Sequence, residues 1–208
     1  MNRAILAARD RLLATIRDFF RSRGFLEVST PLATGEAIPE RHIEATPLRR
    51  GGRWLQASPE LYLKRLLCDG SGPVFEVTRS FRSGEFGAQH RPEFTILEWY
   101  RPRDDMEAGI RLLCELVERC LDVKVFRVTS YREAFESELG LDPHAASREE
   151  LLAVAVRVLG TRAPATGLNV ADRDDLLNDL LAFAIEPKLG SDGPEVLYHY
   201  PASQAALA

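Results

Sequence analysis

Two runs of alternating residues, 73–82 and 92–101, constrain the fold of this 208-residue chain more than any other feature. Both runs have the length of a strand and are rich in β-branched and aromatic residues, and a long loop containing Gly84 and Gly87 joins them. A long connection of this kind is compatible with an antiparallel pair. We therefore predict that the two runs form the centre of a sheet.

One face of the second run combines groups of different chemistry. Because side chains alternate along a strand, Phe94, Glu98 and Tyr100 share a face. A carboxylate in mid-strand is costly to bury unless a cation meets it, so Glu98 beside Tyr100 predicts a site for a ligand ammonium group. The alternative is that Glu98 pairs with an internal Arg or Lys, and structural ion pairs are the commoner case. Phe94 by itself indicates core packing, but the adjacent basic loop allows it to stack on adenine.

The loop between the two runs is rich in cations and in glycine. Arg82 ends the first run, and His90 and Arg91 precede the second. With Gly84 and Gly87 supplying backbone freedom, these three potential cations could surround a polyphosphate. The alternative is a solvated hairpin. The loop is not a Walker loop, since GxxxxGK[ST] occurs nowhere in the chain.

Composition excludes several classes of protein. The chain has 27 basic and 31 acidic residues, a net charge of −4, which argues against holding nucleic acid by bulk charge. No apolar run approaches the roughly 20 residues of a membrane-spanning helix, and the first residues lack the apolar core of a secretion signal, so we expect a cytoplasmic protein. Cys68, Cys114 and Cys120 form no CxxC pair, and their odd number favours reduced, mostly buried thiols over disulfides or a zinc site.

The rest of the chain places helices and short strands around the predicted antiparallel pair, which indicates an α+β fold, and its length suits one domain, 1–208, or one domain plus an incomplete piece. The predicted helices cover 2–23, 58–69, 104–121, 130–139, 147–159 and 172–185, and short strands cover 25–28, 53–56, 124–128 and 196–200. Two capping boxes, Ser130 with Glu133 and Ser147 with Glu150, open two of these helices. We expect a surface loop at 33–53 and a linker at 161–167.

Four parts of the chain carry a resemblance to a known family. The segment 81–85, FRSGE, followed by 90–101, HRPEFTILEWYR, resembles the second motif of class II aminoacyl-tRNA synthetases in their lysine-type form. The segment 23–31, RGFLEVSTP, resembles the first motif, and 57–65, ASPELYLKR, the lysine-type amino-acid loop. The segment 198–204, YHYPASQ, is similar to a later part of the family. The chain looks most like the short lysyl-tRNA synthetase paralogues that attach β-lysine to elongation factor P.

The resemblance implies a role for each matching residue. Arg82 would bind the α-phosphate of ATP and is the implied catalytic residue. Further ATP contacts would come from the turn Ser83, Gly84 and Glu85, from His90 and Arg91 at the phosphates, and from Phe94 on adenine. Lysine or β-lysine would be held by Ser58, Pro59, Glu60, Glu98 and Tyr100. Arg91 replaces an asparagine usual in the family, and Gly84 a common carboxylate.

The resemblance also implies an arrangement of domains and partners. It implies an antiparallel sheet flanked by helices, a homodimer formed through the first motif, and magnesium accompanying ATP. The third motif and the magnesium ligands would follow Ala208, so we expect an incomplete catalytic domain with no metal ligands in this chain. Because the predicted first helix begins almost at Met1, we expect no anticodon-binding domain, and this expectation favours elongation factor P over tRNA as partner. The alternatives are a fragment of a tRNA-charging lysyl enzyme and a catalytically silent module that dimerises and binds a ligand.

Overall fold

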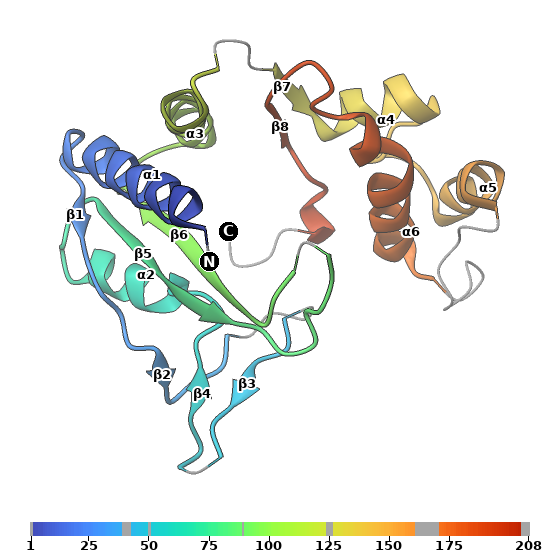
Figure 1. Cartoon of the computed structure of the whole chain (residues 1–208). Helices are drawn as coiled ribbons and strands as arrows, with labels where there is room; N and C mark the ends of the chain where they lie inside the picture. The colour runs from blue at the N-terminus through green and yellow to red at the C-terminus, as the bar shows by residue number, and fades with distance from the viewer. Residues whose placement is uncertain are drawn as a thin grey trace. The chain divides into compact units, whose positions relative to one another are not determined.

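The computed structural model describes residues 2–38, 43–49, 51–88, 90–123, 127–160 and 171–204. The chain divides into two compact units, 1–120 and 121–208, each with its own elements (Figure 1). Both units mix helices and strands, so the predicted α+β class is confirmed.

The first unit is built around the predicted pair of long strands. Its helices are α1 (Arg3–Arg21), α2 (Glu60–Cys68) and α3 (Met106–Leu121), and its strands are β1 (Leu26–Glu27), β2 (Ala33–Thr34), β3 (Thr46–Pro47), β4 (Trp54–Leu55), β5 (Val74–Phe81) and β6 (Glu93–Tyr100). Strands β5 and β6 are antiparallel along their whole length. Strand β1 joins the far side of β5 in parallel, so this sheet is mixed. A parallel pair needs a long crossover connection, and the segment from β2 through α2 supplies it.

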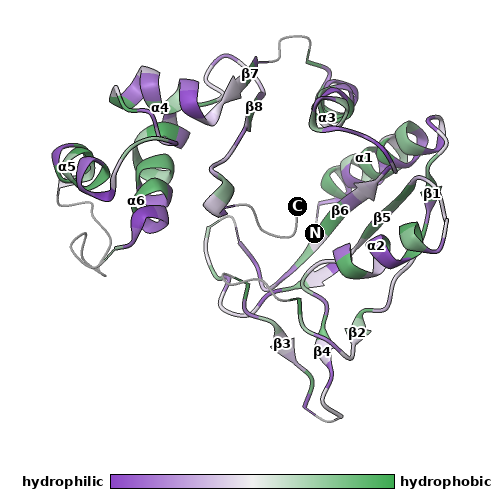
Figure 2. Ribbon diagram, turned by 180° about the vertical axis from the view of Figure 1, so that it is seen from behind, coloured by the Kyte–Doolittle hydropathy of each residue, from purple (hydrophilic) through white to green (hydrophobic). Residues whose placement is uncertain are grey.

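Register gives the β5–β6 pair two different faces. Glu76 lies opposite Glu98, and Ser80 lies opposite Phe94, so the even-numbered side chains of both strands share one face, which we call the even face. The odd-numbered face is apolar and carries Phe75, Val77, Leu97 and Trp99. Figures 1 and 2 show α1 and α2 on opposite sides of this pair.

Helices α1 and α3 cover the odd-numbered face. The Asn2 side chain caps α1 by accepting the backbone N–H of Ala4, as the sequence predicts. At the other end of α1, Phe20 is fully buried and stacks on Phe75, with ring centroids 4.8 Å apart. Leu112 and Leu116 of α3 belong to the same core. This packing leaves the even face of the strands to α2 and to the segment that precedes it.

A second small sheet lies in the segment expected to be a surface loop. Strands β2 and β3 each pair with β4 in antiparallel fashion, giving the order β2-β4-β3. The expectation of a loop through 33–53 is therefore wrong at β2 and β3. Both strands have only two residues, too short for alternation to be visible in the sequence. The predicted strand at 53–56 is confirmed as β4.

The second unit contains a helical core and a parallel strand pair. Its elements are β7 (Arg127–Ser130), α4 (Tyr131–Leu139), α5 (Arg148–Leu159), α6 (Arg173–Leu180), a π-helical turn (Leu181–Ile185), a short 3₁₀ turn (Glu186–Lys188), β8 (Glu195–Tyr198) and a last 3₁₀ turn (Ala202–Gln204). Strands β7 and β8 pair in parallel. Both predicted capping boxes are present, and Asp172 with Asp175 forms a third. The predicted linker at 161–167 lies outside the described residues, as does part of the strand predicted at 124–128.

Two further expectations concern cysteines and membranes. All three cysteines are free thiols, as expected, but Cys68 is exposed at the end of α2, where the helix surface meets solvent. The expectation of mostly buried thiols is wrong for that residue, while Cys114 and Cys120 are half-buried. In the described part of the chain, no helix has both the length and the apolar character that crossing a membrane requires.

Candidate functional site

The centre of the candidate site is the Glu98 carboxylate on the even face. Ser58 Oγ donates a hydrogen bond of 2.5 Å to Glu98 Oε1, and the Tyr100 hydroxyl lies 3.4 Å from Glu98 Oε2. The structure thus brings together three residues that the sequence assigned to amino-acid binding. In the described contacts, hydroxyl groups rather than an internal cation hold this carboxylate.

Ser58 reaches Glu98 because α2 begins beside the even face. Its Oγ also accepts the backbone N–H of Glu60 at 3.1 Å, which supports the first turn of α2. Pro59 is fully buried and occupies the N-cap position, so the first helical residue is Glu60, whereas the sequence predicts a Ser58 cap with Pro59 as the first helical residue. One hydroxyl therefore joins the start of α2 to Glu98, the carboxylate that the sequence predicts to bind the substrate.

Glu60, the second predicted carboxylate, has an internal partner. Lys64 Nζ lies 2.6 Å from Glu60 Oε1, one helical turn away. The same ammonium group lies 5.9 Å from the centre of the Tyr100 ring. An internal ion pair, considered as the alternative for Glu98, is thus found at Glu60. The sequence analysis did not single out Lys64, although the i,i+4 spacing would have indicated this pair.

The local electrostatics favour a positively charged ligand. Burial raises the pKa of Glu98 above its ordinary value, and the negative charge of Glu60 raises it further, while the Ser58 and Tyr100 hydrogen bonds and the Arg82 charge oppose the shift. Burial and the same two carboxylates also raise the pKa of Tyr100, so its hydroxyl stays protonated at neutral pH. An ammonium group placed here would stabilise both carboxylates.

Arg82 lies at the end of β5, beside the carboxylate centre. Its Nε donates to the backbone oxygen of Ala57 at 3.3 Å, and its Nη1 lies 3.5 Å from Glu85 Oε1. The guanidinium carbon is 5.1 Å from the centre of the Phe94 ring. The structure therefore brings together the predicted phosphate-binding arginine and the predicted adenine-stacking ring.

The turn after Arg82 rests on a segment near β3. Ser83 donates its backbone N–H to Glu44 O, and the hydroxyls of Ser83 and Thr46 lie 3.0 Å apart. Gly84 has φ +77°, and a Cβ there would lie 3.2 Å from a Glu44 carboxylate oxygen. Residues with a side chain rarely adopt this backbone conformation, so the local geometry accounts for glycine at this position.

His90 and Arg91 lie on the exposed part of the loop. Arg91 Nη1 donates to the backbone oxygens of Gly87 and His90 at 2.7 and 3.0 Å. These bonds close the loop on itself. In the described contacts, neither residue touches Arg82 or Phe94, so their roles at the ATP phosphates stay predictions.

Two buried polar residues near the site escaped the sequence analysis. Glu76, 2% exposed, lies opposite Glu98 on β5, and Gln56, 3% exposed, follows β4. Alternation along the first long run would have placed Glu76 on the same face as Glu98. No local signal could have found Gln56, because its partners are distant in sequence.

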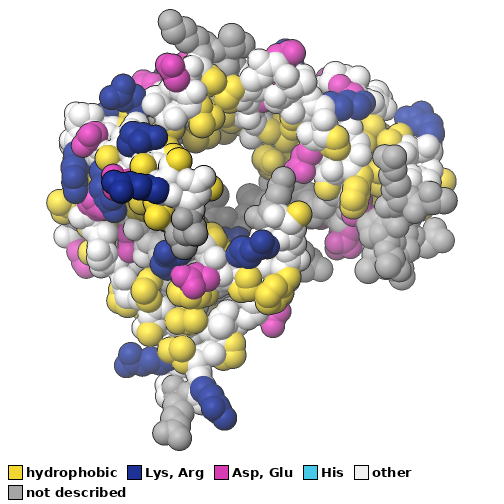
Figure 3. Space-filling view, viewed as in Figure 1, with side chains coloured by type: hydrophobic (Ala, Val, Ile, Leu, Met, Phe, Trp, Pro, Cys, Tyr) yellow, Lys and Arg dark blue, Asp and Glu magenta, His cyan; other side chains and the backbone are white. Residues whose placement is uncertain are grey.

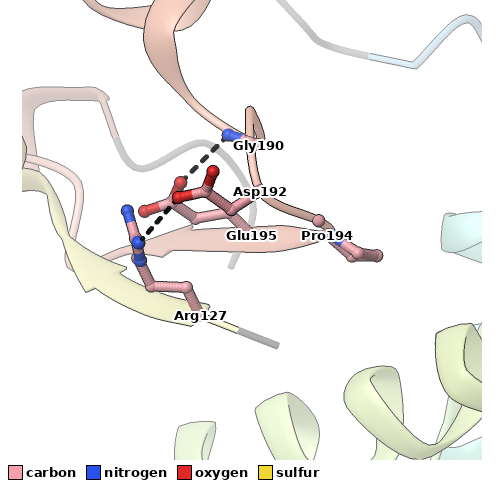
Figure 4. Close-up of a pocket in the computed structure, with 6 residues that line it drawn as sticks. Arg127, Gly190, Asp192, Pro194 and Glu195 are labelled. Carbon is pink, nitrogen blue, oxygen red and sulfur yellow. Dashed lines mark hydrogen bonds and ion pairs between the residues drawn. The ribbon is translucent and has the colours of Figure 1, made fainter. Parts of the chain in front are cut away.

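A small cavity and a larger hollow lie among the described residues of the second unit, and neither combines the chemistry of the Glu98 centre. The smaller, about 20 Å³, is lined by Arg127, Asp192 and Glu195 among others (Figure 4). Each of its charged groups already has a partner, since Arg127 pairs with Asp192, and Glu195 accepts hydrogen bonds from the Gly190 N–H and the Thr129 hydroxyl. The larger, an open hollow of about 590 Å³, is lined by Ser130, Arg132, His144, Tyr198, His199, Tyr200 and Ala202. Part of the segment 198–204, which resembles a later part of the family, thus lines this hollow.

The described residues do not form a metal centre. Within these ranges, no group of three or more His, Cys, Asp or Glu side chains could hold a metal ion. The carboxylates near Glu98 therefore fit an organic cation better than magnesium, and we derive no step through a metal.

A mixed sheet with one polar face that carries an arginine, an aromatic ring and carboxylates is the arrangement expected of a class II synthetase-like catalytic unit. The chain belongs to the family of class II tRNA synthetases for D, K and N, whose pattern matches residues 1–200. It is 41% identical over 211 residues to elongation factor P--(R)-beta-lysine ligase of Pasteurella multocida (strain Pm70). The match covers 98% of this chain and 64% of that relative's length.

Proposed function

We propose that this chain activates lysine or β-lysine with ATP as an aminoacyl-adenylate and passes the aminoacyl group to a lysine of elongation factor P. The observation that carries this proposal is the cluster of Ser58, Glu98 and Tyr100 beside the Arg82–Phe94 pair. It places a carboxylate that can bind an amino group next to a guanidinium and an aromatic ring. The name of the Pasteurella relative supports the choice of elongation factor P.

Glu98 and Glu60 would receive the amino groups of the substrate. A charged hydrogen bond from an ammonium group to a carboxylate is stronger than a neutral one. Glu60 already pairs with Lys64, so the substrate ammonium at that position would share the carboxylate with the internal cation. Tyr100, protonated and beside Glu98, would bound the site for the side chain of the amino acid.

Arg82 would act in the first chemical step. An oxygen of the substrate carboxylate attacks the α-phosphorus of ATP, the bond from that phosphorus to the bridging oxygen breaks, and pyrophosphate leaves. Negative charge builds on the α-phosphate oxygens, and a fixed guanidinium stabilises it. The bond from Arg82 to Ala57 O holds the guanidinium in place before substrate binds. Phe94 would stack on adenine.

The second step would transfer the aminoacyl group. The uncharged Nζ of the acceptor lysine attacks the carbonyl carbon of the adenylate, an amide forms, AMP leaves and the nitrogen loses a proton. Since the chain spans 64% of the relative's length, residues outside this chain would contribute to both steps. We also propose a cytoplasmic location, which the three free thiols support.

Dimerisation through the first motif, which in this family comprises a long helix and a strand and therefore includes α1, is part of the proposal. Helix α1 carries three exposed apolar side chains, Ile5, Leu6 and Leu12. Figure 3 shows hydrophobic and basic side chains side by side over this helix. An exposed apolar stripe on a helix is typical of an interface with another copy. We expect Leu12→Glu to convert a dimer to a monomer in light scattering, whereas Leu121→Glu, at an exposed leucine outside the first motif, leaves the dimer intact.

The experiment that tests the proposal measures ligand binding and activation by the 208-residue chain. Non-hydrolysable lysyl- and β-lysyl-adenylate analogues are titrated during thermal unfolding. A ligand at 100 times its Kd adds about 2.7 kcal/mol of stability, which moves the melting temperature by several degrees. Amino-acid-dependent exchange of pyrophosphate into ATP then reports the first step. Aminoacylation of elongation factor P is compared with aminoacylation of tRNA.

Each outcome separates the candidate functions. Binding of the β-lysyl analogue together with modification of elongation factor P supports the proposal. Charging of tRNA would instead identify a tRNA-charging enzyme. Binding without pyrophosphate exchange would identify a silent binding module or a chain that needs further residues for catalysis. A chain that melts cooperatively and binds neither analogue would contradict the proposal for this chain.

A further inference from the structure

Gln56 connects three segments that are distant in sequence. Its backbone N–H donates to Leu32 O, and its backbone oxygen accepts the N–H of Phe81, both at 2.9 Å. Its side-chain Nε2 donates to Arg79 O at 3.0 Å, and Thr78 Oγ1 lies 3.4 Å from the same nitrogen. The residue is 3% exposed, so these bonds form away from solvent, where leaving one unmade is costly.

Thr30 connects Gln56 to the strand that faces Glu98. Its hydroxyl donates to Gln56 Oε1 at 3.3 Å, and its backbone N–H donates to Glu76 Oε1 at 3.0 Å. Glu76 is almost completely buried, and its second oxygen, Oε2, has no hydrogen-bond partner among the described residues. The segment after β1 is therefore fixed to β5 by polar contacts, at the register position opposite Glu98.

The two residues after Gln56 make the contacts that organise the site. The backbone oxygen of Ala57 accepts the Nε–H of Arg82, and the hydroxyl of Ser58 donates to Glu98. Both contacts depend on where the backbone at 57–58 lies. Gln56 fixes that backbone on one side through Leu32 and on the other through Phe81 and Arg79.

We propose that Gln56, held by Thr30, is a positioning residue that sets Ala57 and Ser58 against Arg82 and Glu98. It touches no substrate. It acts on the Arg82 guanidinium and on the Glu98 carboxylate together, because both are held by adjacent residues of one segment. What the site binds rests on the proposed function, but the positioning itself concerns contacts present in the chain without ligand.

Titration of the Glu98 carboxyl group tests this proposal without any ligand. The pKa of Glu98 depends on its burial, on Glu60, Tyr100 and Arg82, and on the Ser58 hydrogen bond, which lowers it. Glu76 lies opposite on β5. With carboxyl carbons of glutamate labelled, carbon NMR follows each titration, and Glu98→Gln assigns the resonance. Loss of the Ser58 bond in Ser58→Ala raises the pKa of Glu98 and provides the reference shift.

The variants separate positioning from general stability. Thr30→Val removes the hydrogen bond from Thr30 to Gln56, and Gln56→Met removes that bond and the one from Gln56 to Arg79 O. We expect each variant to raise the pKa of Glu98, as Ser58→Ala does. Thr30→Ser keeps the hydroxyl and restores the wild-type value. Thr34→Val is the matched control, since Thr34 is also buried and donates to backbone oxygens, but in the β2–β4 region.

Ligand affinity supplies a second measurement. Gln56→Met should weaken binding of the amino acid and of ATP together, each by about tenfold for the loss of one positioned hydrogen bond. If Thr30→Val or Gln56→Met lowers the melting temperature but leaves the pKa of Glu98 unchanged, the proposal is overturned. A Ser58→Ala variant whose Glu98 titrates like that of the wild type would also overturn it. If the wild-type chain binds no adenylate analogue, the proposed function fails, and the carboxyl titration still decides the role of Gln56.

Discussion

Glu76 and Glu98 lie opposite each other on β5 and β6, yet the two carboxylates have different partners. Glu76 is buried and accepts a backbone N–H from Thr30, whereas Glu98 is half-buried and accepts hydroxyl groups from Ser58 and Tyr100. The first carboxylate fixes a neighbouring segment. The second, Glu98, can still accept hydrogen bonds from a ligand. Its half-buried negative charge destabilises the fold until a cation binds.

This difference predicts that Glu98→Gln stabilises the chain and weakens ligand binding. Because the pKa of Glu98 is raised in the folded state, its stabilising contribution is present below the ordinary glutamate pKa and is lost as the pH rises through the folded value. Above the folded pKa the ionised group therefore destabilises the fold relative to the protonated group, and glutamine removes that cost. Affinity for a lysyl-adenylate analogue should fall about 10- to 100-fold with the loss of a charged hydrogen bond.

Thermal unfolding at neutral and acidic pH, together with calorimetric titration, measures both effects. Glu93→Gln is the control, since Glu93 is an exposed carboxylate on the same strand that pairs with Arg79. A less stable Glu98→Gln variant with unchanged affinity would show that Glu98 is only a structural residue.

Arg82→Ala should lose most of the affinity for the nucleotide. The guanidinium at the end of β5 is already fixed by Ala57 O and lies over Phe94, so little order has to be gained on binding. We expect ATP affinity to fall by about 100-fold, in line with loss of a strong charged contact, and pyrophosphate exchange to fall at least as much.

Arg79→Ala is the matched control for this arginine. Arg79 lies on the odd-numbered face of the same strand and pairs with the exposed Glu93. Exposed pairs of this kind contribute about 0–1 kcal/mol, so the variant should melt and bind nearly as the wild type does. Equal loss of ATP affinity in both variants would place the nucleotide elsewhere.

The sequence predicted the strand pair and its chemical faces because alternation is a local property. Phe94, Glu98 and Tyr100 could be placed on one face from their spacing alone, and the structure confirms that face. The partner of Ser58 could not be predicted from spacing, since Glu98 lies forty positions further along the chain. The contacts that join Gln56 and Thr30 to β5 depend in the same way on the tertiary fold.

Local chemistry also explains which elements were predicted well. The boxes at Ser130 and Ser147 use residues three positions apart, and both formed as predicted. Strands β2 and β3 were missed because two-residue strands have no periodicity and form only through pairing with β4. For the same reason the sequence could not indicate that β1 would join β5 in parallel.

Phe20→Ala should be severely destabilising. Its ring is fully buried and lies close to Phe19, Phe25, Phe75 and Trp99. Removing such a ring leaves a cavity and costs about 3–5 kcal/mol, which urea unfolding would record. Phe86→Ala is the control, because Phe86 is 79% exposed and its loss should change the free energy of unfolding by less than about 0.5 kcal/mol. Similar effects of both variants would contradict the core that we describe.

The capping glutamates Glu133 and Glu150 should make the second unit sensitive to acid, with a sign opposite to that of Glu98. Hydrogen bonds from the backbone N–H groups of Ser130 and Ser147, and from their hydroxyls, lower the pKa of each glutamate. A lowered pKa contributes stability above the ordinary value that is lost as the pH falls through the folded value. Thermal unfolding from neutral pH to below about pH 4 should therefore show a loss that Glu133→Gln with Glu150→Gln reduces. Glu149→Gln is the control, because it removes a carboxylate from the first turn of α5 outside the capping box, and this variant should keep the wild-type pH dependence of stability. An unchanged pH dependence in the double variant would show that the two boxes contribute nothing to acid sensitivity.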